Sequence, residues 1–221
     1  MRIDVFHNFH FSFEEVQPLY EEIQTILKSK DFEDDYPVNS AVREIIPMLV
    51  DNDGIRCSYI IRKAENVTLN TGAQIGRYMK KADYFAFFVC TAGKIFTDLT
   101  AHYNAVGNYL EAFVTDAIGS LTAEKVADNM QAQLEFEMQS EGLRISNRYS
   151  PGYCNWPVSG QRELFEQMNG FPIPVSLTES CLMLPIKSVS GVIGVGAHIR
   201  KYPYACQICK NKDCIYRKII Q

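Results

Sequence analysis

Four stretches of the chain have the hydrophobic pattern of β-strands. Residues 54–63 alternate apolar and polar side chains, which predicts a strand with one buried face. Residues 83–93 are apolar on both faces, which predicts a central strand covered on both sides. Strands are also expected over residues 2–9, with Ile3 and Val5 on one face, and over the glycine-rich residues 187–199.

Helical periodicity accounts for most of the remaining apolar residues. The stretch 14–30 predicts an amphipathic helix, in which Pro18 fits only within the first turn. A second helix is expected over residues 39–50, before the turn sequence DNDG, and a short one over residues 157–169. Residues 101–140 predict one bent helix or two stacked helices.

Helices and strands follow one another without strict alternation, which favours an α+β fold over a doubly wound sheet. A length of 221 residues, 47% of them hydrophobic, is enough for one domain with a full core. We expect this domain to span residues 1–200. Residues 201–221 would form a cysteine-rich C-terminal tail.

Charge and hydropathy narrow the classes of partner. A formal net charge of -4 argues against nucleic acid or an anionic membrane as the main partner. The first residues lack the apolar run of a signal peptide, and the apolar stretch 84–90 is too short to cross a bilayer. A cytoplasmic location is therefore expected, with the seven cysteines reduced or metal-bound.

The sequence RYSPGY, residues 148–153, has the chemistry of a small-molecule site. The planar guanidinium of Arg148 can bind both oxygens of a carboxylate. Gly152 permits close approach of a ligand to the backbone, and Tyr153 offers a ring face that tolerates a cation. A ligand with one carboxylate and one positive charge fits this set, although the hexapeptide alone favours a surface arginine beside a structural turn.

Other motifs follow a fixed order around this turn: LEAF at 110–113, LTES at 177–180 and PIKSVSG at 185–191. Together with RYSPGY they make the chain resemble the activation domain of cobalamin-dependent methionine synthase, chiefly over residues 84–195. The resemblance implies a mixed or antiparallel twisted sheet with flanking helices. It also implies that S-adenosylmethionine is bound by six residues: Arg148, Ser150, Gly152, Tyr153, Glu111 and Tyr202.

The family's reaction gives the function that the resemblance implies. A cob(II)alamin is reduced by one electron and trapped by methyl transfer from S-adenosylmethionine, which keeps methionine biosynthesis running. The cobalamin, folate and homocysteine modules of a synthase do not fit into 221 residues. We therefore expect a free-standing reactivation subunit, with cobalamin supplied by a partner methyltransferase and electrons by a flavodoxin- or ferredoxin-type donor. Nothing in the chain suggests a general base or a catalytic triad.

The C-terminal cysteines suggest a metal. Cys206, Cys209 and Cys214 are spaced C-x2-C-x4-C, a spacing that suits zinc or an iron–sulfur cluster. Cys154 is the expected fourth ligand, with Cys181 or His198 as alternatives, and free thiols or a redox pair are the simpler interpretation. Cys57 and Cys90 lie in strand patterns and are expected to be buried small hydrophobes.

Two other functions remain open on the sequence alone. A metal-bearing redox protein could retain the fold and no longer use S-adenosylmethionine. A scaffold protein could bind a corrinoid protein without chemistry of its own.

Overall fold

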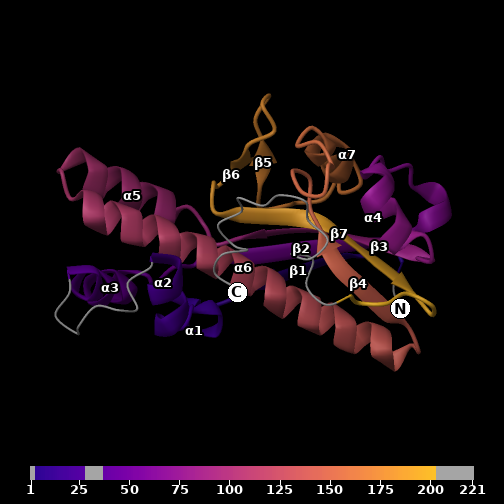
Figure 1. Ribbon diagram of the computed structural model, residues 1–221, viewed down its shortest axis with the longest axis horizontal. Helices are drawn as coiled ribbons and strands as arrows, with labels where there is room; N and C mark the ends of the chain where they lie inside the picture. The colour runs from indigo at the N-terminus through magenta and orange to yellow at the C-terminus, as the bar shows by residue number, and fades with distance from the viewer. Residues whose placement is uncertain (1–2, 28–36, 203–221) are drawn as a thin grey trace.

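An antiparallel sheet with the strand order β1-β2-β3-β7-β4 forms the centre of the computed structural model, which describes residues 3–27 and 37–202 (Figure 1). A separate two-stranded hairpin, β5-β6, stands away from it. The strands are β1 (Phe6–His10), β2 (Arg56–Lys63), β3 (Tyr84–Thr91), β4 (Arg144–Tyr149), β5 (Ser176–Leu177), β6 (Met183–Leu184) and β7 (Ser188–Gly196). The α+β class and the antiparallel flanked sheet are confirmed.

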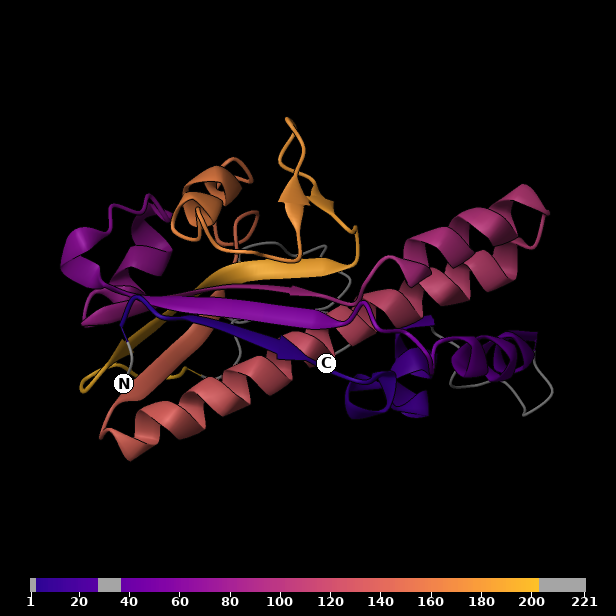
Figure 2. The same cartoon turned by 180° about the vertical axis from the view of Figure 1, so that it is seen from behind.

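Helices cover both faces of the sheet. The long helix α6 runs diagonally beneath it together with the N-terminal helices, while α4, α7 and the β5-β6 hairpin lie on the other side (Figures 1 and 2). The helices are α1 (Phe13–Val16), α2 (Tyr20–Leu27), α3 (Pro37–Met48), the 3-10 turn η1 (Ala64–Asn66), α4 (Gly72–Met79), α5 (Ile95–Ala105), α6 (Tyr109–Ser140) and α7 (Gly160–Glu166).

The sheet core explains the strand patterns. Strand β3 lies between β2 and β7 and is buried on both faces, as its sequence predicts. Strand β2 was expected to bury one face only, which is wrong. Its residues Cys57 and Tyr59 pack on the α6 side, and Ile60 is fully buried in the cluster on the opposite side. Both sides are covered because Ile60 packs in one cluster with Ile75 of α4 and Leu164 of α7.

Near the N-terminus, the structure has two short helices where one was predicted. Helix α1 ends at Val16, Gln17 is extended, and α2 begins only at Tyr20. Pro18 causes the break, because it lacks an N–H and disfavours helical geometry in the residue before it. The expected first-turn position for Pro18 is therefore wrong. The expected strand at residues 2–9 also begins later, since β1 starts at Phe6 and Asp4 lies in a turn.

Two helices, α5 and α6, occupy the region predicted as one bent helix or two stacked helices. Helix α5 begins at Ile95, earlier than expected, and the chain reverses around Gly107 before α6 begins. The helices pack closely at Gly119, where a Cβ atom would lie 2.8 Å from the ring of Phe96. Among the described residues no helix is long and apolar enough to span a membrane.

Strand β4 determines where Arg148 points. Its pairing with β7 shifts between Ile145 and Arg148, so that both side chains lie on the α6 side despite their odd spacing. Tyr149 occupies the opposite face, in the cluster with Trp156. This bulge therefore directs the guanidinium of Arg148 toward helix α6.

Candidate ligand-binding site

Arg148 is the centre of a charged cluster between the edge strand and α6. Its Nη2 donates a hydrogen bond to Oε2 of Glu124 over 3.3 Å, and its Nη1 lies 2.8 Å from Oδ1 of Asp128. The Arg148 side chain is only 10% exposed, whereas the two carboxylate side chains are 47% and 60% exposed. The guanidinium thus lies beneath two acidic side chains that border the solvent.

The two carboxylates are not equivalent. Burial raises the pKa of Glu124 above its ordinary value, the guanidinium of Arg148 opposes this shift, and the charge of Asp128 adds to it. One cation therefore compensates two neighbouring acids, and the cluster carries excess negative charge. This arrangement suits a ligand that brings positive charge as well as a carboxylate.

The turn after β4 has an unusual backbone. Gly152 has a φ of 96°, and its N–H donates to the carbonyl oxygen of Trp156 over 2.8 Å. The backbone N–H of Tyr153 donates to the carbonyl oxygen of Ser150 over 3.2 Å, and Cys154 and Asn155 both have positive φ. The ring of Trp156 is buried in the core on the α7 side. The core thus anchors the turn at Trp156.

Tyr153 and Tyr202 are the exposed aromatic residues among the predicted site residues. The Tyr153 side chain retains 59% exposure at the tip of the turn. Tyr202 lies along β4: its N–H donates to Oδ1 of Asn147 over 2.8 Å, and its carbonyl accepts from Nδ2 of Asn147 over 3.0 Å. The backbone of Tyr202 thus lies beside the strand of Arg148. Its ring, however, lies 5.0 Å from that of Tyr78 on α4, on the face of Tyr149 and opposite to the guanidinium.

Glu111 lies elsewhere. It belongs to the first turn of α6, near Tyr103, which donates a hydrogen bond to Glu44 on α3. Burial raises the pKa of Tyr103, and the charges of Glu44 and, to a smaller extent, Glu111 add to this shift. Thirteen residues of one helix separate Glu111 from Glu124, which corresponds to about 20 Å of helix rise. The structure therefore places Arg148, Ser150, Gly152 and Tyr153 in succession on β4 and the following turn. It brings neither the Tyr202 ring nor Glu111 beside the guanidinium.

Residues of the motifs LTES and SVSG form hydrogen bonds that hold parts of the fold together. Thr178 closes the β5-β6 turn by accepting the N–H of Leu182 at Oγ1 over 3.0 Å. Ser190, which is buried, donates to Oε1 of Gln161 over 2.6 Å and thereby joins β7 to α7. At Gly191, a Cβ would lie 2.5 Å from the carbonyl oxygen of Tyr149, so the glycine permits close strand packing.

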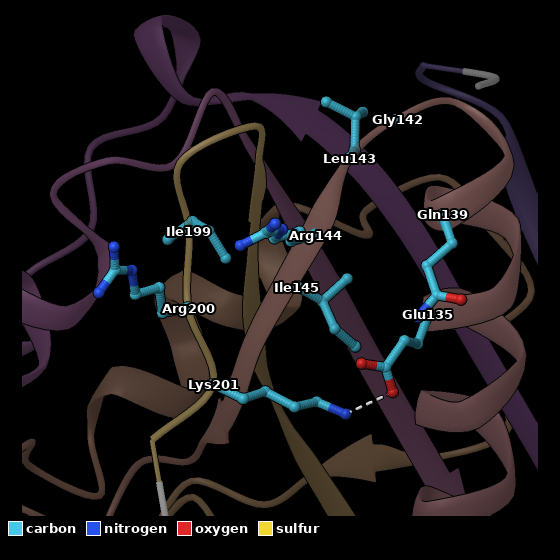
Figure 3. A pocket seen from close by; sticks show the side chains of 9 residues that line it. All are labelled: Glu135, Gln139, Gly142, Leu143, Arg144, Ile145, Ile199, Arg200 and Lys201. Carbon is cyan, nitrogen blue, oxygen red and sulfur yellow. Dashed lines mark hydrogen bonds and ion pairs between the residues drawn. The ribbon is translucent and has the colours of Figure 1, made fainter.

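A surface pocket of about 500 Å³ lies at the other end of β4 (Figure 3). The basic residues Arg144, Arg200 and Lys201 line it, and Lys201 forms an ion pair with Glu135 of α6. None of the six predicted ligand-binding residues is part of its lining. Arg148 lies further along the same strand, where the RYSPGY sequence begins.

Most of the predicted metal ligands lie outside the described residues. This holds for Cys206, Cys209 and Cys214, so the metal site stays a prediction. Cys154 is half-buried in the turn, Cys181 is buried and accepts a hydrogen bond from Arg162, and His198 is exposed. Within residues 3–27 and 37–202, no group of three or more His, Cys, Asp or Glu side chains could hold a metal ion.

The buried pair Cys57 and Cys90 matches its prediction. Both side chains have no exposed area, and they face each other across β2 and β3. Burial raises the pKa of the Cys90 thiol well above its ordinary value, which keeps it protonated and unreactive. These cysteines belong to the core and not to the site.

Two site residues, Glu124 and Asp128, were missed by sequence analysis. They stand four residues apart on α6, so they share one helix face with Ser120 and Asp116. On a helix with one apolar face, such residues are indistinguishable from ordinary solvent-facing acids. The only signal was their four-residue spacing, which is informative only once Arg148 is known to face that helix.

Comparisons with known proteins agree with this architecture. The family model "Vitamin B12 dependent methionine synthase, activation domain" matches residues 12–217. The solved structure "Crystal Structure of the MetH Reactivation Domain bound to AdoHcy" is similar, with a TM-score of 0.62 and 16% sequence identity. The alignment covers 90% of this chain and 81% of that one, so the two share a fold.

Proposed function

Since the chain belongs to the activation-domain family of vitamin B12 dependent methionine synthase, we propose that it binds S-adenosylmethionine and reactivates a corrinoid methyltransferase. The corrinoid would be carried by a partner protein. A low-potential electron donor of the flavodoxin or ferredoxin type would reduce the inactive cobalt before methyl transfer. The proposal covers a free-standing subunit that acts on a separate chain.

One observation carries the proposal: a nearly buried guanidinium next to a stiff turn with an exposed aromatic ring. Arg148 lies at the end of β4, and Gly152 and Tyr153 follow within the turn. A guanidinium in this position can bind the carboxylate of an amino-acid ligand through two parallel hydrogen bonds. The charges of the cluster fit a ligand that is cationic overall.

The other residues of the set would orient the ligand. Gly152 lacks a side chain, and the nearest atom to a Cβ there would be 3.5 Å away, so the ligand can approach the turn backbone. The exposed ring of Tyr153 would lie against the sulfonium, since ring faces attract cations. The chain itself would hold the methyl group in line with its acceptor, which is a positioning effect. The neighbouring structure was solved with the demethylated nucleotide AdoHcy, which is consistent with this assignment.

Calorimetric titration of the purified chain with S-adenosylmethionine tests the proposal. We expect saturable binding by the wild-type protein. In Arg148→Ala, the lost charge-assisted hydrogen bonds should weaken affinity by about tenfold to a hundredfold. Arg144→Ala is the matched control, because Arg144 is an exposed arginine on the same strand. No binding by the wild-type chain, or equal weakening in both variants, would contradict the proposal.

A further inference from the structure

Two cysteines face each other across neighbouring strands of the sheet. Cys57 on β2 and Cys90 on β3 are direct partners in the antiparallel register, and their Sγ atoms lie 2.8 Å apart in a thiol hydrogen bond. Both are free thiols with no exposed area. Carbon atoms, which are smaller than sulfur, pack at about 3.5–4.0 Å, so the two sulfur atoms are closer than packing alone requires.

The backbone geometry of this pair permits a disulfide. Directly opposed residues of two antiparallel strands have Cα atoms about 4.5 or 5.5 Å apart, depending on the type of pair. Disulfides form at Cα separations of about 4.4–6.8 Å. The two sulfur atoms can therefore bond after small side-chain rotations, and the strands need not move. The buried Cys181 differs, since its Sγ accepts a hydrogen bond from Nε of Arg162 over 3.3 Å.

The pair lies near one end of the β2-β3 ladder, on the side of the sheet that α6 covers. A single residue pair lies beyond it, at the start of β2 and the end of β3. Both cysteines belong to the core cluster on the α6 side. Burial raises the pKa of the Cys90 thiol, the hydrogen bond with Cys57 adds to this shift, and the charges of Arg148 and Glu124 also act on it. The pair is therefore within electrostatic reach of the candidate site.

We propose that Cys57 and Cys90 form a redox-active dithiol site, which a low-molecular-weight disulfide oxidises to a disulfide between β2 and β3. One cysteine of the pair, as its thiolate, attacks a sulfur of the small disulfide, whose S–S bond breaks and releases one small thiol. The second cysteine then attacks the protein sulfur of the mixed disulfide and releases the other small thiol. The protein thiols thus lose two electrons and two protons, and both pass to the two small thiols. The site does not depend on the proposed nucleotide binding.

The closed sheet limits the rate of this exchange. The thiolate is the attacking species, and the raised pKa of Cys90 keeps that thiol protonated in the core. A small disulfide therefore reaches the pair only when the end of the ladder opens, as native proteins do locally. Oxidation and reduction should both be slow, so the site responds to a sustained change in redox conditions.

A disulfide at this position would affect the part of the sheet that supports the candidate site. It would close a loop over residues 57–90, which contains α4, and the restricted unfolded chain would make the fold more stable. Strand β3 lies between β2 and β7, and β7 pairs with β4, the strand of Arg148. Oxidation would therefore fix two strands of the sheet on which Arg148 is held.

Incubation of the purified chain with oxidised glutathione, followed by alkylation of free thiols and peptide mass spectrometry, tests this inference. We expect a cross-link between the peptides of Cys57 and Cys90, which dithiothreitol reverses. The melting temperature should rise by about 5–10 °C on oxidation. Cys57→Ala and Cys90→Ala should abolish both effects. Cys181→Ala is the matched control, because it replaces a buried cysteine between β5 and β6, and it should retain both.

The same mapping of the wild-type chain at a urea concentration just below its unfolding transition removes the barrier of the closed sheet. If Cys57 and Cys90 are recovered as two free thiols both with and without urea, the inference fails. It also fails if they are cross-linked to other cysteines and not to each other. These outcomes need no variant to fold, since the wild-type chain alone decides them. Titration with S-adenosylmethionine tests the proposed function separately, whatever the mapping shows.

Discussion

Nη1 of Arg148 lies 2.8 Å from Oδ1 of Asp128, and this ion pair joins the edge strand β4 to helix α6. The arginine is nearly buried and its partners are half-exposed, so water can hydrate the carboxylates when the guanidinium is removed. The contact is therefore suited to recognition more than to stability.

Arg148→Met should reveal this difference. The methionine retains the apolar stem that packs at the sheet edge, and only the charge contacts are lost. We expect the free energy of unfolding in urea to fall by about 1 kcal/mol or less, because pairs with exposed partners contribute little. Affinity for S-adenosylmethionine should fall much further. A loss of several kcal/mol of stability would instead identify Arg148 as a structural residue.

Lys187 and Lys94 provide a comparison of two ion pairs on the same protein. The Lys187 side chain is 11% exposed and contacts both Asp116 and Ser120, while the Lys94 pair with Asp98 is surrounded by solvent. We expect Lys187→Met to destabilise the protein by about 0.5–1 kcal/mol, since its partner Asp116 is half-exposed, like the partners of Arg148. Lys94→Met should change stability by less than about 0.5 kcal/mol. Equal effects in urea unfolding would contradict this assignment.

Gly191 is required by strand packing. A Cβ at this position would lie 2.5 Å from the carbonyl oxygen of Tyr149 and 2.9 Å from the ring of Phe88. Gly191→Ala should therefore destabilise the fold by about 1–3 kcal/mol, as overpacked cores do. Gly76→Ala is the control: Gly76 lies in helix α4 with nothing within 4 Å, and alanine there should stabilise by about 0.5–1 kcal/mol. Thermal melting of the two variants should show shifts of opposite sign.

Tyr59 makes stability depend on pH in the alkaline range. Burial raises the pKa of its hydroxyl, and a hydrogen bond of 2.8 Å to Glu137 adds to this shift. Below pH about 10, which is the ordinary pKa of tyrosine, the hydroxyl stays protonated in both the folded and the unfolded chain. Above it the unfolded chain releases the proton and the folded chain does not, so stability falls by up to about 1.4 kcal/mol per pH unit.

Tyr59→Phe isolates this contribution. Phenylalanine has neither the hydrogen bond nor a hydroxyl that can titrate. The free energy of unfolding of the variant in urea should be lower than that of wild type, and this difference should shrink between pH 10 and 11. Between pH 6 and 8, the difference in free energy of unfolding between the two proteins should stay constant. Parallel curves throughout the alkaline range would contradict the assignment.

The sequence was most informative where one physical signal dominated. The continuous apolar run of β3 predicted a doubly covered central strand, and the structure has it. Pro18 was recognised as a constraint, yet its effect was underestimated, because the apolar spacing continues through the break between α1 and α2. Local backbone chemistry overrode the periodicity there.

Strand β4 and helix α4 were not predicted. The sequence RISNRY of β4 is polar, and its bulge interrupts the alternation that identifies a strand. Helix α4 contains two glycines and little helix propensity of its own. Both elements form because they pack on the sheet, a tertiary effect that a local window of sequence does not contain.

The candidate site was predictable only in part. The stiff turn and its arginine could be recognised from residue chemistry at positions 148–153. The acids Glu124 and Asp128 stand 24 and 20 residues before Arg148 and reach it only through the crossing of α6 beneath β4. That crossing depends on the fold, so the excess negative charge became visible only with the structure.

The most direct test of the central claim is a crystal structure of the chain with bound S-adenosylhomocysteine. We predict that the carboxylate of the nucleotide lies within about 3 Å of the Arg148 guanidinium, a hydrogen-bond distance. The nucleotide sulfur should lie beside the ring of Tyr153. A structure in which Arg148 keeps its ion pairs with Glu124 and Asp128 while the nucleotide binds elsewhere would contradict the account.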